Sequence, residues 1–381
     1  SLVDANTNGT CFQPNIDLPK QGCCYPPTLL TELSPSDPLM QEEIFGPVLV
    51  STSFRTPQEA VQLANNTRYG LAASIWSENV NLCLGLAPAL KAGVIWVNGT
   101  NMFDAAAGFG GIRESGFGRE GGWEGLTAYT KPKAQTTAKS LKPILAKTGT
   151  KSAAFGLDRT TKLYIGGKQT RPDSGYSTAV FDAAGNFISD VPSANRKDIR
   201  NAVEAAQTAE KWSGSTGHLR AQILYFIAEN LSARAAEFAE KINRYMGETN
   251  GAAEVEASLE RLFTYAAWAD KYDGAVRDVP LRGVALALTE PVGVLGAFCP
   301  DDAPLLGLVS LLGPALAMGN RVVLVVSEPY PLIGTEFYQI LETSDVPAGV
   351  VNMLTGAHSE LVTPLASHLN IDAIWSFSSS D

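Results

Sequence analysis

Short runs of apolar residues alternate with capped amphipathic segments along most of the chain, and this alternation limits the fold more than any other feature. Residues 94–97 are apolar on both faces of an extended chain, and residues 292–298 and 322–326 have the same character. Strands that are buried on both faces occur where helices cover a parallel sheet. The alternation therefore predicts an α/β fold of the doubly wound kind.

A helix start is encoded at residues 56–59, which read Thr-Pro-Gln-Glu. Thr56 can cap the helix, Pro57 suits its first position, and Glu59 can return a bond to the cap, so the three form a capping box. We expect this helix to extend to about Thr67. Its buried face should carry Ala60, Val61 and Ala64.

The alternation continues through the rest of the first third of the chain. Residues 74–76 and 94–97 are predicted strands, and residues 81–91 between them are a predicted helix that stops at Gly93. A strand, a helix and a second strand in this order form a βαβ unit with parallel strands. This region is thus predicted to hold part of a doubly wound sheet.

Residues 131–160 differ in composition from the chain on either side. They are rich in Lys, Thr, Ser and Ala and have weak periodicity, which predicts a linker or an extended oligomerisation arm. This prediction divides the chain into residues 1–130, 131–160 and 161–381. No internal repeat relates the first segment to the third.

The third segment begins with a predicted hairpin at residues 164–168, which read Tyr-Ile-Gly-Gly-Lys. Asn195 can cap a helix, and a longer amphipathic helix follows. Residues 306–318 are a predicted apolar helix between the strands at 292–298 and 322–326. The buried faces of the two amphipathic helices should carry Ile199, Val203, Ala206, Leu219, Ile223, Ile227 and Leu231.

The 381-residue chain has a formal net charge of -10. Nucleic-acid affinity depends on Lys and Arg side chains that release counterions, so we expect no nucleic-acid partner. The five cysteines show no CxxC pair and no zinc spacing, which indicates a reducing, cytoplasmic environment. The apolar runs are broken before they reach the length of a membrane span, so we expect no membrane partner.

The first candidate site lies in residues 41–48, which read Gln-Glu-Glu-Ile-Phe-Gly-Pro-Val. A carboxylate such as that of Glu43 can accept bonds from two hydroxyl donors, and an aromatic ring such as that of Phe45 can exclude water. An isolated Glu-x-Phe would more often be a strand-end carboxylate and a core residue. Three further motifs follow in order, however: Tyr-Gly-Leu-Ala-Ala at 69–73, Trp-Val-Asn at 96–98 and Phe-Gly-Gly-Ile-Arg-Glu-Ser-Gly-Phe-Gly-Arg-Glu at 109–120.

Together these four motifs resemble the aldehyde dehydrogenase family. The resemblance implies that Glu43 binds the nicotinamide ribose of NAD, with NADP not excluded, and that Phe45 lies against the nicotinamide. It also places Phe103 in the loop that contacts the aldehyde, although packing within that loop explains Phe103 equally well. The glycines of residues 109–120 suit a backbone that turns tightly beneath a substrate tunnel.

The third segment resembles the opening of the same family, so the end of one unit precedes the beginning of another. Residues 290–296, 314–320 and 346–352 are similar to the family's nucleotide-binding domain. Such a junction resembles the tandem aldehyde dehydrogenases of family 16, whose second unit is degenerate. Residues 1–130 would then be the C-terminal part of a catalytic domain, and residues 161–381 the N-terminal, nucleotide-binding-like part of the degenerate unit.

Three departures from the family pattern weaken the case for chemistry in the third segment. Asp302 stands where an Asn amide would stabilise an oxyanion, and a carboxylate there would repel the developing charge. Val325 replaces a Lys that would help to fix the cofactor, although the retained Glu328 favours NAD over NADP. Ser378 takes the place of a Gly that allows a pyrophosphate to approach.

No catalytic nucleophile can be identified in the chain. Cys299 precedes Pro300 at the end of an apolar strand, where a buried and inert thiol is expected. Cys23 and Cys24 lie just before Glu43, whereas the family's nucleophile lies much further upstream, beyond residue 1. Three histidines lack metal-ligand spacing and are expected on the surface or in packing, namely His218, His358 and His368.

The resemblance implies oxidation of a small-molecule aldehyde to a carboxylic acid through a cysteine thiohemiacetal, with the nucleophile outside this chain and the chain alone inactive. A non-catalytic scaffold for assembly or protein partnering is the main alternative. The residues from Tyr129 onward resemble an arm that adds a strand to a neighbouring subunit, which favours a homodimer. A circularly permuted single enzyme is a third hypothesis. It is less favoured, because the middle part of the family's unit is missing from the chain and would have to be dispensable.

Overall fold

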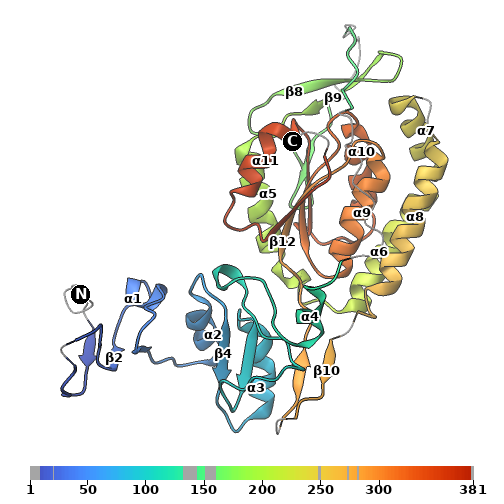
Figure 1. Cartoon of the computed structure of the whole chain (residues 1–381). Coiled ribbons are helices and arrows are strands. Elements are labelled where there is room, and N and C mark those ends of the chain that lie inside the picture. The colour runs from blue at the N-terminus through green and yellow to red at the C-terminus, as the bar shows by residue number, and fades with distance from the viewer. Residues whose placement is uncertain are drawn as a thin grey trace. The chain divides into compact units, whose positions relative to one another are not determined.

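The computed structural model divides the chain into two compact units (Figure 1). Unit 1 comprises residues 1–138 and 275–287, and unit 2 comprises residues 139–274 and 288–381. The structure describes residues 9–19, 21–131, 144–150, 160–247, 250–272, 274–280 and 283–378.

Unit 2 is built on a six-stranded sheet with the order β15-β12-β13-β14-β6-β7. The chain moves outward from β12 to β14 and then returns to place β15 on the other side of β12, which creates a topological switch point. The predicted α/β, doubly wound fold is confirmed here. The four parallel strands are β12 (Val294–Phe298), β13 (Arg321–Val325), β14 (Val351–Leu354) and β15 (Ala373–Ser376).

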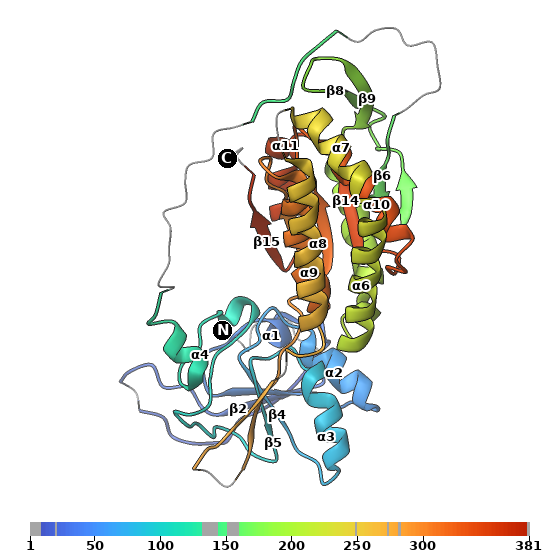
Figure 2. The same ribbon diagram turned by 90° about the vertical axis from the view of Figure 1, so that its right-hand side faces the viewer.

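Helices cover both faces of this sheet (Figures 1 and 2). Successive residues of β12 alternate between two cores, because neighbouring side chains on a strand point to opposite faces. Val294 and Phe298 join one core, and Leu295 and Ala297 join the other. The helices of the first face are α5 (Arg196–Thr208) and α11 (His358–Ala366), and those of the second are α9 (Pro304–Ala317) and α10 (Pro331–Glu342).

Helix α5 begins where the sequence places its cap. The Asn195 side chain accepts the N–H of Asp198 at 3.2 Å, and the Asp198 carboxylate accepts the N–H of Asn195 at 2.9 Å. The predicted core positions of α5 and α6 are confirmed except for Leu219, which lies in the first turn of α6 and is 42% exposed. The other helices of unit 2 are η3 (Glu210–Trp212), α6 (Gly217–Ala233), α7 (Ala235–Met246) and α8 (Gly251–Trp268).

Two hairpins complete unit 2. The predicted hairpin at residues 164–168 is confirmed, and its turn needs glycine, since Gly166 and Gly167 have φ values of 62° and 74°. The strands are β6 (Leu163–Ile165) with β7 (Lys168–Thr170), and β8 (Ser177–Phe181) with β9 (Phe187–Pro192).

Unit 1 holds smaller sheets. The predicted βαβ unit is confirmed, because β4 (Ala72–Ile75) and β5 (Val94–Val97) pair in parallel and α3 (Val80–Leu86) connects them. A second sheet consists of β1 (Thr10–Phe12), β2 (Thr28–Thr31) and β3 (Val48–Ser51). The remaining elements are α1 (Pro38–Gln41), α2 (Pro57–Asn65), η1 (Ala87–Ala89), η2 (Arg113–Ser115), α4 (Gly122–Thr127), β10 (Ala275–Arg277) and β11 (Ala285–Ala287).

Helix α2 begins as predicted but ends earlier. Thr56 caps it by accepting the N–H of Glu59 at 3.1 Å. The helix stops at Asn65 rather than near Thr67, because the Arg113 guanidinium donates to the carbonyl oxygens of both residues, at 3.1 and 2.5 Å. The predicted buried face is not confirmed, because Ala60 and Val61 are half-buried and Ala64 is exposed.

Helix α3 is also shorter than the predicted 81–91. It ends at Leu86, and the chain continues as η1, which contains Pro88. Proline has no backbone N–H to donate and disfavours helical geometry in the residue before it, which explains the early end.

The hairpin β10–β11 groups with unit 1, although the sequence assigned it to the third segment. Arg277 Nη2 donates to Glu124 Oε1 of α4 at 2.8 Å. These two residues are too far apart in the sequence for local patterns to reveal the contact.

The predicted linker at residues 131–160 lies largely outside the described residues. In the part of the chain that the structure describes, no helix is long and apolar enough to cross a membrane.

Candidate functional site

The two predicted cofactor residues lie on the loop between α1 and β3 of unit 1. Helix α1 ends where Glu42 takes an extended conformation, and Phe45 then adopts a left-handed backbone with φ 50°. The Phe45 side chain is 92% exposed. Glu43 is exposed as well, and no described residue makes a hydrogen bond or an ion pair with its carboxylate. Both side chains are thus available to a ligand.

Arg68 connects this loop to the glycine-rich motif at residues 109–120. Its guanidinium lies 2.5 Å from a Glu42 carboxylate oxygen and 3.3 Å from one of Glu114. It also donates to the Tyr69 hydroxyl at 2.9 Å. Arg68 could not be predicted from the sequence, because its partners are far away in the chain and its only local signal is the neighbouring motif at 69–73.

The motif at 69–73 and the motif at 109–120 meet at Gly70. The Gly70 N–H donates to Ser115 Oγ at 3.0 Å, and the Gly70 carbonyl accepts the N–H groups of Ile112 at 2.9 Å and Gly93 at 3.1 Å. A Cβ on Gly70 would lie 2.6 Å from the Lys91 carbonyl oxygen. The backbones approach so closely that only glycine fits, which agrees with the tight turns expected there.

Phe103 lies in a cluster of three aromatic rings. Its ring makes edge-to-face contacts with Trp96 at 5.6 Å and with Phe109 at 4.8 Å between centroids. Trp96 Nε1 also donates to the carbonyl oxygen of Met102, which fixes the loop. Phe103 is still 56% exposed, so packing and a substrate contact are compatible. Among the described residues no ring contact joins Phe103 to Phe45.

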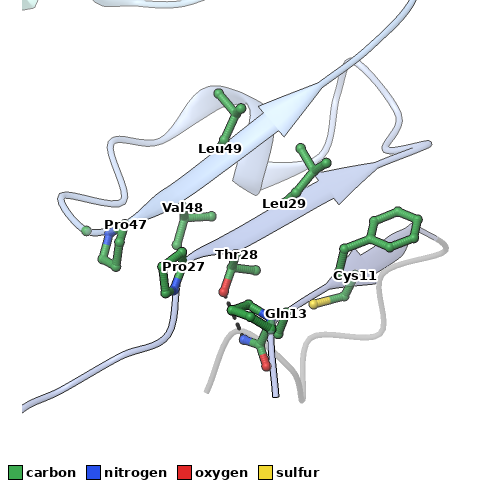
Figure 3. Close-up of a pocket in the computed structure, with 11 residues that line it drawn as sticks. Cys11, Gln13, Pro27, Thr28, Leu29, Pro47, Val48 and Leu49 are labelled. Carbon is green, nitrogen blue, oxygen red and sulfur yellow. Dashed lines mark hydrogen bonds between the residues drawn. The ribbon is translucent and has the colours of Figure 1, made fainter. Parts of the chain in front are cut away.

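A groove of about 870 Å³ runs along the β1–β2–β3 sheet and continues from the candidate loop (Figure 3). Residues of all three strands line it, including Phe12 of β1, Leu29 of β2 and Leu49 of β3. Its polar lining side chains include Gln13 and Thr28, and the Gln13 amide donates to Thr28 Oγ1 at 2.9 Å. The groove is mostly apolar, and the described residues contain no group of His, Cys, Asp and Glu that could bind a metal.

A second candidate site lies in unit 2, at the carboxyl ends of the parallel strands. His358, the first residue of α11, is 2% exposed. Its ring bridges two loops, with Nε2 2.7 Å from the Val326 carbonyl oxygen and Nδ1 2.7 Å from Ser378 Oγ. The ring also contacts Phe298 edge-on, at 5.4 Å between centroids. The His358 N–H donates to Glu328 Oε2 at 2.8 Å.

Acidic residues surround the loop after β12. Asp301 is buried and accepts the Ser327 hydroxyl at 2.8 Å, whereas Asp302 is exposed. Glu254 caps α9 by accepting the N–H groups of Leu305 and Leu306 at 2.8 and 3.1 Å. Burial raises the pKa of Glu254, although these two donors oppose the shift.

Cys299 is fully buried, as expected from its sequence context. Burial raises the pKa of its thiol well above the usual value, and the Asp301 carboxylate adds to the shift. A protonated thiol is a poor nucleophile, so Cys299 has no catalytic environment.

Known proteins resemble this chain over both units. The profile of the aldehyde dehydrogenase family matches residues 6–135 and 171–381. The chain therefore belongs to the aldehyde dehydrogenase family, and the match accounts for the motifs of unit 1 and the doubly wound sheet of unit 2 together.

Individual relatives match shorter stretches. Betaine aldehyde dehydrogenase of Bacillus subtilis is 40% identical over 114 residues, which is 30% of this chain and 23% of the relative. The crystal structure of betaine aldehyde dehydrogenase from Staphylococcus aureus in complex with NAD+ aligns with a TM-score of 0.55 and 25% identity, over 57% of this chain and 44% of that one. The NAD+ complex of aldehyde dehydrogenase from Bacillus cereus gives a TM-score of 0.54 and 27% identity, over 57% and 46%.

The chain thus spans about a quarter of the length of the curated relatives that it matches and less than half of the solved structures.

Proposed function

We propose that the chain is part of an NAD-dependent aldehyde dehydrogenase that oxidises aldehydes to carboxylic acids through a cysteine thiohemiacetal, with the nucleophilic cysteine in another part of the protein. The observation that carries the proposal is the junction at Gly70, where two separate family motifs are hydrogen-bonded into one backbone framework. Arg68 extends this framework to the loop that holds Glu43 and Phe45.

Glu43 and Phe45 fit the nicotinamide end of a dinucleotide. An exposed carboxylate without a partner in the described part of the chain can accept two ribose hydroxyls, and an exposed ring beside it can cover one face of a nicotinamide. Bound NAD would accept the hydride from the substrate. Phe103, at the edge of its aromatic cluster, would contact the aldehyde, while Trp96 and Phe109 hold it in place.

The separation of the family match into residues 6–135 and 171–381 supports a tandem arrangement. In this proposal residues 1–130 end a catalytic unit, and residues 161–381 begin a second, degenerate unit of the kind found in family 16. Residues 131–160 would be a linker or an arm that joins two subunits in a cytoplasmic homodimer.

The test measures intact mass and aldehyde-dependent NADH formation for the protein as it is expressed. A mass well above 40.4 kDa together with turnover supports the proposal. The Glu43→Gln variant should then weaken NAD binding about tenfold or more, because it weakens a charge-assisted hydrogen bond to the ribose. Glu78→Gln, at another exposed position, is the matched control and should leave binding unchanged. Equal NAD affinity in both variants contradicts the role of Glu43.

A non-catalytic scaffold is the second candidate, and the hydrogen-bonded loops around His358 favour it for unit 2. In a scaffold the sheet would serve assembly alone. A mass equal to that of the 381-residue chain, with no turnover of aliphatic or aromatic aldehydes, would support this candidate over the enzyme.

A further inference from the structure

Three loops at the carboxyl edge of the unit 2 sheet are bound to one another by side chains of the chain itself. We call this group, formed by Asp301, Ser327, Glu328, His358 and Ser378, the carboxyl-edge latch. Asp301 and Ser327 join the loops after β12 and β13, and His358 joins the loops after β13 and β15. The latch thus links the ends of strands on both sides of the switch point.

The carboxyl-edge latch lies where a ligand would bind in a fold of this kind. In open α/β sheets a ligand binds in the crevice at the carboxyl ends of the strands, beside the switch point. Here the His358 ring is 2% exposed and touches the end of β12 through Phe298, the end of β13 through the Val326 carbonyl, and the loop after β15 through Ser378. A buried side chain therefore fills the part of the crevice where a ligand would lie.

The charges of the same loops oppose a phosphorylated ligand. Residues 299–303, 326–330, 355–358 and 377–378 contain Asp301, Asp302 and Glu328 but no Lys or Arg. The first N–H of α11, which could bind a phosphate at a helix N-terminus, is donated to Glu328 instead. A pyrophosphate in this position would meet acidic side chains and an occupied donor.

We propose that the carboxyl-edge latch replaces a bound dinucleotide in unit 2, with His358 as the positioning residue that holds the three loops without any ligand. Two hydrogen bonds, one of them buried, and an aromatic contact stabilise the loops in the way that a cofactor's polar groups would. The inference concerns unit 2 alone and does not depend on the proposed activity, whose cofactor residues lie in unit 1.

The first experiment titrates the whole 381-residue chain with NAD by calorimetry, up to about 1 mM, a range that covers ordinary cofactor affinities. Amide hydrogen exchange with and without NAD locates any contact. We expect no protection at residues 326–330 or 355–360, and protection confined to unit 1 also supports the inference. Saturable binding that protects either of those two segments overturns it.

The second experiment tests whether the His358 ring fills and stabilises the edge. His358→Ala should lower the melting temperature by roughly 5 °C or more, because the Val326 carbonyl and the Ser378 hydroxyl lose their partner and a cavity forms. Added imidazole, at about 10 mM, should restore part of the loss by binding in that cavity. His218→Ala, which removes an exposed histidine on α6, should show neither effect.

Ser378→Ala keeps the His358 ring and removes one bond, so it covers the case in which His358→Ala does not fold. It should lower the melting temperature by about 2 °C and still leave NAD unbound. Melting temperatures of His358→Ala or Ser378→Ala equal to that of His218→Ala would contradict the latch, as would NAD protection of residues 355–360 in Ser378→Ala.

Discussion

Units 1 and 2 belong to the same family but bury their strands to different degrees. In unit 2 every residue of β12, β13 and β14 is buried. In unit 1 the residues of β3 and β4 are half-buried or exposed in alternation. The buried apolar residues of the described part of unit 1 are Leu30, Leu33 and Cys83.

The difference shows two ways of holding a backbone in place. Unit 2 relies on side-chain cores on both faces of a sheet, whereas unit 1 relies on close backbone contacts at glycines such as Gly70, Gly93 and Gly110. Large aromatic side chains stay exposed in unit 1, including Phe45 and Trp76 at 92% and 67%.

The largest predicted effect compares two phenylalanines. Phe298 is 1% exposed in the unit 2 core, and Phe298→Ala should cost about 3–5 kcal/mol in the free energy of unfolding. Phe45→Ala, at a site 92% exposed, should change it by less than about 0.5 kcal/mol. Urea titration of both variants checks this. Equal costs would mean that Phe45 is buried in solution.

The second prediction tests the glycine contacts of unit 1. A Cβ on Gly110 would lie 2.0 Å from the Gly118 carbonyl oxygen, so Gly110→Ala should force a backbone shift that costs about 1–3 kcal/mol. Gly118→Ala is the control within the same motif, because nothing lies within 4 Å of its Cβ position. Hydrogen exchange at residues 109–120 reports the shift. A stable Gly110→Ala with unchanged exchange would show that backbone packing does not hold this motif.

The third prediction compares helix caps of the same type in the two units. Asn195→Ala in unit 2 and Thr56→Ala in unit 1 should each cost about 1 kcal/mol, since each removes an acceptor for the first-turn N–H groups. Thermal melts of the two variants measure the costs. If Asn195→Ala lowers the stability and Thr56→Ala does not, α2 unfolds separately from the rest of unit 1.

The smallest effect concerns the ion pairs of Glu237 in unit 2. Hydrogen bonds from Arg234 and Lys241 lower the pKa of Glu237 from its usual 4.5 to about 2. The stabilisation is therefore present above about pH 4.5 and is lost as the pH falls towards 2. The pair is partly exposed, so Glu237→Gln should cost less than about 1 kcal/mol at pH 7. The difference from the parent protein should shrink in melts below pH 4, and a constant difference would contradict the ion-pair origin.

Local sequence signals predicted the fold well, because the deciding interactions are local. The capping box at Asn195, the two-glycine hairpin turn and the apolar strands on both sides of α9 can each be recognised within a few residues. The ends of α2 and α3 and the place of β10–β11 were missed. The α2 end and the place of β10–β11 depend on Arg113 and Arg277, whose partners are far away in the chain.

The candidate sites were predictable only in part for the same reason. The motifs identified Glu43, Phe45 and Phe103 as candidate site residues. The exposure of these side chains and the ring contacts of Phe103 follow from tertiary packing. The sequence shows that Ser378 stands where the family pattern has a Gly. It does not show the hydrogen bond between Ser378 and His358, which lie 20 residues apart, because each residue taken alone resembles an ordinary surface or packing residue.

Amide hydrogen exchange of the whole chain, with and without NAD, tests the difference between the units most directly. We expect slow exchange in β12, β13 and β14, fast exchange in β3 and β4, and no effect of NAD on the loops that the carboxyl-edge latch joins. Equal exchange in both sets of strands, or NAD protection of residues 355–360, would contradict this expectation.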